Sequence, residues 1–276
     1  MKNARKIQRK VKITMIKLIA SDLDGTLLQN NSQSINKRML EIIEKLHEKG
    51  ILFVAASGRQ YPNLYRLFEP VSKHMAFICE NGGLVKYQDK VISKTPMNRE
   101  LGIMLMEDIW NTDGCEVLLS GENTSYLKPK AASYLHRMKD IVKNNVTVID
   151  DFSKVKEDFI KISVYEESGI VEGHGSYFTN KWGNQLKSTI SGHGWLDFTA
   201  PTVNKGTALS ALTNALSIDI SETMAFGDNY NDLEMLSLVG HGYVMENAVE
   251  DIKNRYHLRS TLVEDTLTAL LEDGIL

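Results

Sequence analysis

The chain has 276 residues, enough for one large domain or two smaller ones. Its 42% hydrophobic and 24% charged residues are typical of a globular protein, and its net charge of -3 excludes an electrostatic case for nucleic acid or an anionic membrane as partner. No apolar run approaches the roughly 18 residues of a membrane-spanning helix. From the net charge and the length of the apolar runs together, we expect neither a nucleic-acid nor a membrane partner.

Residues 1–14 read as a basic N-terminal extension, rich in Lys and Arg and without an acid in its first twelve positions. No apolar segment of signal-peptide length follows, so we do not expect secretion. We interpret the extension as a solvated tail, which an upstream start before Met15 would also produce. Cys79 and Cys115 lack CxxC spacing, which predicts neither a disulfide framework nor a zinc knuckle and suits a reducing cytoplasm.

The first elements alternate between strand and helix. An apolar run at 15–21 predicts a strand, and helical spacing of apolar residues predicts a helix over 34–49, with Ser34 as its cap. Near-continuous apolar runs at 51–57 and 75–81 predict two more strands, with a short helix at 63–68 between them. Such runs are typical of a parallel sheet covered on both faces, so we expect βαβ units and a doubly wound, Rossmann-like α/β sheet.

The pattern of apolar and polar residues changes from about Tyr87. The strands become more polar, and helices are predicted over 99–111 and 131–144, which favours a smaller α+β unit with one exposed sheet face. Buried-strand texture returns with a helix at 205–216, strands at 223–229 and 242–246, and a helix at 232–239 between them. We therefore predict a core formed by residues 15–86 and 198–276, with an inserted α+β cap at 87–197.

Polar and acidic groups follow the predicted core strands. In an open parallel sheet, ligands bind beyond the carboxyl ends of the strands. We therefore expect the groups that follow four strands to converge, with the Lys205 ammonium beside them: Asp22, Asp24 and Thr26; Ser57, Gly58 and Arg59; Asn81, Gly82 and Gly83; and Gly227, Asp228, Asn229, Asn231 and Asp232. Carboxylate and other oxygen ligands favour a hard cation such as Mg²⁺, and hydroxyl, backbone N–H and ammonium groups bind phosphate.

Four sequence motifs resemble those of a known family. "DLDGT" at 22–26, "SGR" at 57–59, Lys205 in "VNKGTAL" and "GDNYND" at 227–232 look like the motifs of the haloacid dehalogenase-like hydrolases. The similarity is strongest to the Cof-type sugar-phosphate phosphatases and covers essentially residues 15–276. The inserted segment lies where that branch carries its substrate cap.

The resemblance implies a Mg²⁺-dependent phosphatase that acts on small phosphorylated metabolites through an aspartyl-phosphate. Asp22 would be the nucleophile, and Asp24 the acid and base. Mg²⁺ would be bound by Asp22, the backbone carbonyl of Asp24 and Asp228, and Asp232 would support the metal and Lys205. Phosphate would be bound by the Leu23 and Gly58 N–H groups and by the side chains of Ser57, Lys205 and Asn231.

Several alternatives remain open from the sequence. A phosphomutase of the same superfamily would share these motifs, and a non-catalytic phosphosugar-binding regulator should have lost Asp22 or Asp24, which this chain retains. Arg59 is as well explained by a surface or inter-domain ion pair as by ligand binding. His174 and His193 lie in Gly-rich stretches, and we interpret them as loop positions rather than ligands. No motif identifies the substrate or an oligomeric state.

Overall fold

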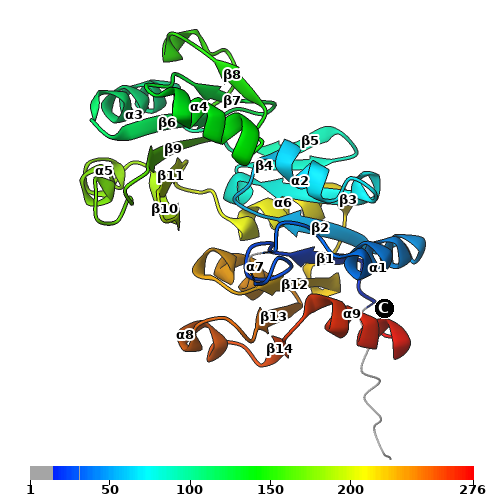
Figure 1. Cartoon of the computed structure of the whole chain (residues 1–276). Coiled ribbons are helices and arrows are strands. Elements are labelled where there is room, and N and C mark those ends of the chain that lie inside the picture. Colours follow the sequence, from blue (N-terminus) through cyan, green and yellow to red (C-terminus); the bar gives the residue numbers. More distant parts are fainter. Residues whose placement is uncertain (1–14, 31) are drawn as a thin grey trace, which may run out of the picture.

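The computed structural model describes residues 15–30 and 32–276 and contains two sheets (Figure 1). The predicted basic extension at 1–14 lies outside the described residues. The larger sheet is built from both ends of the described chain, and the smaller one belongs to the segment between them. The predicted architecture, an α/β core with an inserted α+β unit, is thus confirmed.

The larger sheet contains eight strands within the part of the chain that the structure describes. Its order is β14 (Leu258–Ser260), β13 (His241–Met245), β12 (Thr223–Gly227), β1 (Leu18–Ser21), β2 (Leu52–Ala56), β3 (Met75–Cys79), β4 (Leu84–Tyr87) and β5 (Lys90–Lys94). The strands from β14 to β3 are parallel, whereas β4 and β5 form an antiparallel hairpin at one edge. The chain winds away from β1 in both directions, as in a doubly wound sheet.

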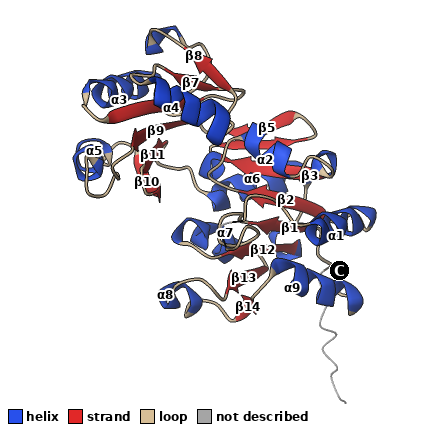
Figure 2. Cartoon of the chain, viewed as in Figure 1, coloured by secondary structure: helices blue, strands red, loops and turns tan. Residues whose placement is uncertain are grey.

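Helices cover both faces of this sheet (Figure 2). One face packs against α1 (Lys37–Glu48), α2 (Tyr61–Leu67) and α9 (Val263–Glu272), and the other against α6 (Lys205–Leu216), α7 (Leu233–Leu238) and α8 (Glu250–Lys253). Strand side chains alternate between the faces, so Ile19 joins the first core and its neighbours Leu18 and Ala20 the second. Two covered faces explain the near-continuous apolar runs.

The inserted unit has a six-stranded sheet among the residues described. Its order is β10 (Lys187–Gly192), β11 (Trp195–Thr199), β9 (Lys161–Glu166), β6 (Cys115–Ser120), β7 (Ser125–Leu127) and β8 (Val146–Val148). Side chains of α3 (Arg99–Asn111) and α5 (Gly175–Trp182) pack in an apolar cluster on one face. Side chains of α4 (Ala132–His136) and the π-helical turn Arg137–Ile141 join a smaller cluster on the other.

Three local expectations differ from the structure. The hairpin strand β5 belongs to the core sheet, and β11 continues the cap sheet to Thr199, so the sheets change near residues 95 and 200 rather than at 87 and 197. An edge strand has one unpaired side and can therefore contain more polar residues than a central strand. The polar composition of β5 resembles that of the cap strands, which explains why it was expected in the cap. The expected helix at 131–144 is shorter and becomes π-helical, and α1 is capped by Asn36 rather than Ser34.

A cavity of about 1340 Å³ lies between the two units. Its floor is formed by loops at the carboxyl ends of β1, β2 and β12, and its roof includes side chains of β6, β9, β10 and β11. The cap sheet face that was expected to be exposed therefore lines this cavity in part. Within residues 15–30 and 32–276, no helix has both the length and the apolar character to cross a membrane.

Candidate active site

Asp22 lies at the end of β1, where the sheet reverses its winding direction. Its carboxylate forms an ion pair with Lys205, the first residue of α6, and Lys205 Nζ is also 2.7 Å from Asp232 Oδ1. Lys205 and Asp232 are fully buried and Asp22 is nearly so. One ammonium therefore holds together carboxylates from two strand ends that are separated by 210 positions in the sequence.

Asp232 has both carboxylate oxygens engaged. Its Oδ1 accepts from Lys205, and its Oδ2 accepts hydrogen bonds from the backbone N–H groups of Asp228 and Asn229, each at 3.0 Å. These contacts fix the loop that follows β12 and orient Lys205 at the same time. The arrangement fits the supporting position expected for Asp232.

Asp228 follows β12 and lies close to Asp22, which follows the neighbouring strand β1. Thr26 Oγ1 donates a hydrogen bond of 2.7 Å to Asp228 Oδ1. Gly25 has φ of +94°, and a Cβ there would lie 2.3 Å from Asp228 Oδ2. Glycine is therefore required at this turn for two independent reasons, its backbone conformation and the close approach of the Asp228 carboxylate.

Burial and the charge of Asp232 raise the pKa values of Asp22 and Asp228. Burial raises the pKa of Asp22, the charge of Asp232 raises it further, and the Lys205 ammonium offsets only part of the effect. Burial and Asp232 likewise raise the pKa of Asp228, although the Thr26 hydrogen bond opposes the shift. Conversely, Asp22 and Asp232 raise the pKa of Lys205 in spite of its burial. The site therefore favours additional positive charge beside Asp22 and Asp228.

This donor set fits a hard divalent cation. Carboxylate oxygens of Asp22, Asp228 and Asp232 all lie within 4.8 Å of one another. Oxygen donors suit Mg²⁺, and a cation would offset both the burial of these carboxylates and the repulsion from Asp232, which together raise the pKa values of Asp22 and Asp228. Since Asp232 is already engaged by Lys205 and two N–H groups, Asp22 and Asp228 are the carboxylates best placed to bind it.

Ser57 and Gly58 follow β2 and lie against the loop that follows β3. The Ser57 carbonyl accepts from Asn81 N–H at 3.0 Å, and Ser57 Oγ accepts from Arg59 N–H at 3.2 Å. Asn231 Nδ2, from the loop after β12, donates to Asn81 Oδ1 at 3.2 Å. Asn81, which has a φ of 55°, thus links the second and fourth motifs. It was expected among the converging groups, but this linking contact was not predicted.

Leu23 is buried in the turn between the two acids, and its carbonyl accepts from the N–H groups of Thr26 and Leu28 at 3.1 and 2.7 Å. Asp24, by contrast, projects toward the cavity with its side chain 58% exposed. Arg59 binds it through two contacts, Nε to Oδ2 at 3.0 Å and Nη2 to Oδ1 at 2.5 Å. Arg59 therefore forms an ion pair, and its partner is one of the two predicted catalytic carboxylates.

The structure brings the predicted site residues together. Asp22, Asp24, Ser57, Gly58 and Asn231 line the floor of the cavity. Lys205 and Asp232 lie beneath the floor, buried against Asp22. The carboxyl ends of the strands in a parallel sheet meet at one edge, which predicts this grouping. All four motifs meet at that edge.

Lys161 on β9 was not predicted as a site residue. Its Nζ lies 2.9 Å from the Gly58 carbonyl, 2.6 Å from Glu80 Oε2 and 3.2 Å from Asp197 Oδ2. Ser163 donates to the other Asp197 oxygen at 2.6 Å. The lysine thus joins the cap sheet directly to the loop that carries Gly58, and no feature of a cap strand in the sequence indicates this contact.

The chain is similar in sequence to known phosphatases and to one family of hydrolases. A family model described as haloacid dehalogenase-like hydrolase matches residues 19–265. The chain is 29% identical over 233 residues to the 5-amino-6-(5-phospho-D-ribitylamino)uracil phosphatase YbjI of Escherichia coli strain K12, covering 84% of this chain and 86% of that protein. It is 24% identical to the HMP-PP phosphatase of Enterobacter sp. strain 638, covering 86% and 87% of the two chains.

Solved structures share this fold. A crystal structure from Eubacterium rectale superimposes with a TM-score of 0.83 at 27% identity, covering 93% of this chain and 99% of that one. The sugar phosphatase BT4131, of subclass IIB of the same superfamily, has a TM-score of 0.74 at 22% identity, covering 94% and 100%. The second likeness shows the fold alone, and it includes the inserted unit.

Proposed function

The chain belongs to the haloacid dehalogenase-like hydrolases, and on that premise we propose that it is a Mg²⁺-dependent phosphatase that hydrolyses phosphate monoesters of small metabolites through an aspartyl-phosphate. The observation that carries the proposal is the cluster of Asp22, Lys205, Asp228 and Asp232 beneath the cavity. The named phosphatases among its relatives support the reaction class.

The Mg²⁺ ion would be bound by the carboxylates of Asp22 and Asp228 and by the backbone carbonyl of Asp24. When bound, it supplies positive charge that reduces repulsion between an anionic nucleophile and a phosphate dianion. Asp232 is proposed to support the site rather than to bind the ion, because its oxygens already accept three hydrogen bonds.

Asp22 is proposed as the nucleophile. A carboxylate oxygen attacks phosphorus, the Asp22–phosphorus bond forms, and the bond between phosphorus and the ester oxygen breaks. The Lys205 ammonium holds the carboxylate in place and shares in binding the phosphate oxygens, together with Ser57 Oγ, Asn231 Nδ2 and the N–H groups of Leu23 and Gly58. Preorganised donors of this kind stabilise charge as it develops in the transition state.

Asp24 is proposed as the general acid and base. It donates a proton to the leaving oxygen in the first step and removes one from the water that hydrolyses the aspartyl-phosphate in the second. In the structure both of its oxygens bind Arg59, so it must release at least one contact to exchange a proton. We propose that the anionic substrate attracts Arg59 and thereby frees Asp24.

The substrate is proposed to be a small phosphorylated metabolite enclosed by the cap. The cavity of about 1340 Å³ has room for a phosphate and an organic group of modest size. Polar roof residues such as Lys161, Ser163 and Asp197 suit a polar organic group, such as a sugar, better than an apolar one. The cytoplasmic location stays a prediction.

A panel of phosphorylated metabolites, assayed for inorganic phosphate with and without Mg²⁺, tests this function. Activity should disappear with EDTA, return with Mg²⁺ and be inhibited by Ca²⁺, because the larger ion accepts extra oxygen ligands and can occupy both oxygens of Asp22. Asp22→Asn is the inactive control. Full turnover by metal-free enzyme would contradict the metal assignment, and isomerised sugar phosphate without phosphate release would indicate a mutase.

A further inference from the structure

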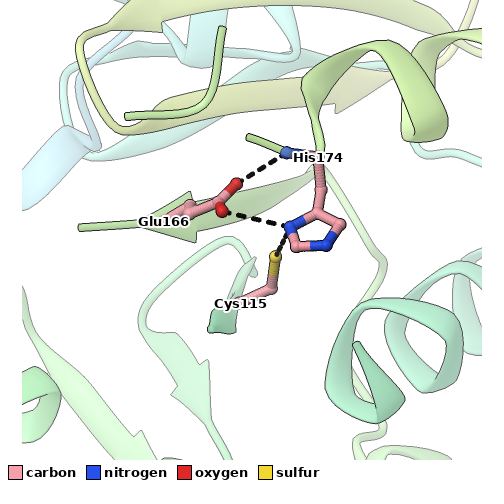
Figure 3. Close-up of side chains that lie close together, drawn as sticks. All are labelled: Cys115, Glu166 and His174. Carbon is pink, nitrogen blue, oxygen red and sulfur yellow. Dashed lines mark hydrogen bonds and ion pairs between the residues drawn. The ribbon is translucent and has the colours of Figure 1, made fainter. Parts of the chain in front are cut away.

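A second cluster of side chains of the types that bind metal ions lies in the inserted unit (Figure 3). Cys115 begins β6 and Glu166 ends β9, and the two residues are directly paired across the antiparallel strands. His174 comes from the loop before α5 and points at both. None of the three lines the cavity described above, so the proposed phosphatase reaction does not use this cluster.

The three side chains lie close enough together to share one ion. His174 Nδ1 lies 3.7 Å from Cys115 Sγ and 3.0 Å from Glu166 Oε1, and ligand atoms of all three lie within 4.8 Å of one another. With zinc–ligand bonds of about 2.0–2.3 Å, tetrahedral neighbours are about 3.3–3.7 Å apart. The thiol and the imidazole already have this spacing. The imidazole and the carboxylate are slightly closer than this, and the thiol and the carboxylate lie within 4.8 Å, so a bound ion would require adjustment of the Glu166 side chain.

The surroundings hold the ligands in position. His174 donates its backbone N–H to Glu166 Oε2 at 2.8 Å, which orients the carboxylate with Oε1 toward the imidazole. A Cβ at Gly173 would lie 2.2 Å from Glu166 Oε2, so a larger residue there would displace the Glu166 carboxylate from its present position. Cys115 and Glu166 are buried, whereas the His174 side chain is 43% exposed, which leaves the cluster open to solvent on one side.

We propose that Cys115, Glu166 and His174 form a binding site for a borderline-soft divalent cation of the zinc class, with solvent as a further ligand. A thiolate, an imidazole and one carboxylate are the donor types that zinc uses, and hard Mg²⁺ avoids sulfur. Binding releases the thiol proton to solvent. Bound metal would fasten the loop of residues 167–174 and the start of α5 to the end of the cap sheet.

A purely structural cluster is the alternative outcome. Cys115 also contributes to the apolar cluster of the cap, and burial together with Glu166 raises the pKa of its thiol to about 12. In that case the thiol would stay protonated, and the contact between Glu166 and His174 would alone hold the loop. The two outcomes differ in whether a thiolate–metal bond forms, which spectroscopy detects directly.

The test is a Co²⁺ titration of the full chain after treatment with chelator, in excess Mg²⁺ to occupy the active site. We expect a near-ultraviolet thiolate-to-cobalt absorption band that saturates at one equivalent and disappears when Zn²⁺ is added. Cys115→Ala should abolish the band, and Cys79→Ala, at the other buried cysteine, should retain it. Absence of the band, or its persistence in Cys115→Ala, would overturn the proposal.

His174→Gln provides a second variant at a half-exposed position, where the fold should tolerate the change. It should weaken Co²⁺ binding at least tenfold and change the band, while phosphatase activity and circular dichroism remain those of the unmodified chain. Unchanged Co²⁺ affinity and an unchanged band in His174→Gln would also overturn the proposal.

Discussion

Asp22 and Asp24 are two residues apart and have opposite environments. Asp22 is buried against the Lys205 ammonium, whereas Asp24 is mostly exposed and bound by Arg59. Carboxylates in different environments can take different roles in one reaction. The buried acid is held rigidly, as a nucleophile must be, and the exposed acid can reach both the leaving group and water.

Asp24→Asn should therefore separate the two half-reactions. Asparagine keeps the shape and the backbone carbonyl but cannot exchange a proton, so hydrolysis of a sugar phosphate should slow by roughly 10²–10⁴-fold. An aryl phosphate has a leaving group that needs little protonation, so Asp22 should still be phosphorylated. We expect a stoichiometric burst of phenolate, followed by a stall, in rapid-quench measurements.

Mass spectrometry of the stalled Asp24→Asn enzyme should find one added phosphoryl group on Asp22. Asp22→Asn is the matched control and should show neither burst nor adduct. Normal turnover of both substrates by the Asp24 variant, or a phosphoryl group on another residue, would contradict the roles proposed for these two acids.

Asp228 should carry a cost to stability when no metal is bound. Its pKa is raised, chiefly by burial, so the folded state binds its proton more tightly than the unfolded state does. The contribution of Asp228 to the free energy of unfolding of the metal-free protein therefore decreases as pH rises from about 4, the unfolded pKa, through the folded value. In metal-free protein near neutral pH, Asp228→Asn should raise the melting temperature, and the gain should shrink toward pH 4.

Differential scanning calorimetry in EDTA checks this pH dependence. In a second series with Mg²⁺ in place of EDTA, the ion should stabilise the unmodified chain more than Asp228→Asn. Asp150→Asn is the control of opposite sign, because the contact with Lys154 lowers the pKa of Asp150. Its charged form favours folding above pH 4, so its removal should not raise the melting temperature. If metal-free Asp228→Asn were less stable than the unmodified chain at neutral pH, the Asp228 charge would not destabilise the metal-free fold.

Strand β9 connects the cap to the catalytic loops through Lys161. This nearly buried ammonium contacts the Gly58 carbonyl, Glu80 and Asp197. Burial raises the pKa of Glu80, and Lys161 opposes that shift. Because a buried charge without its partner is costly, the lysine is expected to stabilise the contact between the two units rather than simply fill space.

Lys161→Met should lower the free energy of unfolding by about 3–5 kcal/mol, since it leaves two carboxylates without their cation. Adding Glu80→Gln should recover part of the loss, and urea denaturation of the single and double variants measures the coupling. Lys154→Met, in an exposed pair with Asp150, should change stability by less than about 0.5 kcal/mol. Additive effects at Lys161 and Glu80 would contradict the coupling.

At the scale of the whole molecule, the two units have largely separate apolar cores. The core sheet is covered by its own helices on both faces, and the cap sheet packs against α3 and α5. Ile160, which precedes β9, is buried in the core-sheet cluster near Gly83, and Val203, which precedes α6, is buried in the cap cluster. The core should therefore fold without the cap, with a modest loss of stability.

Replacing residues 96–201 by a short linker tests the role of the cap. The core should keep its circular dichroism and cooperative unfolding, because its apolar surface is buried mostly against its own helices. The roof of the cavity is lost, so kcat/KM for the best metabolite should fall much more than kcat/KM for a small aryl phosphate. Equal losses for both substrates would mean that the cap plays no part in selectivity.

The sequence by itself determined the core fold, the family and the site motifs. Apolar runs that alternate with helical patterns require a covered parallel sheet. Its strand ends place Asp22, Ser57 and Asp228 together whatever the details of packing, and Lys205 begins the helix that precedes the Asp228 strand. These features depend on local periodicity and on a general property of α/β sheets, so they can be read without coordinates.

Only the tertiary structure decided the contacts that depend on how the core and the cap meet or on which residues of neighbouring strands are paired. The edge strand β5 was assigned to the cap because one unpaired side gives it a polar texture. The Arg59–Asp24 pair, the position of Lys161 over Gly58 and the meeting of Cys115, Glu166 and His174 each join segments distant in sequence. Side-chain contacts of this kind follow from strand register and cap placement, which leave no periodic signal in the chain.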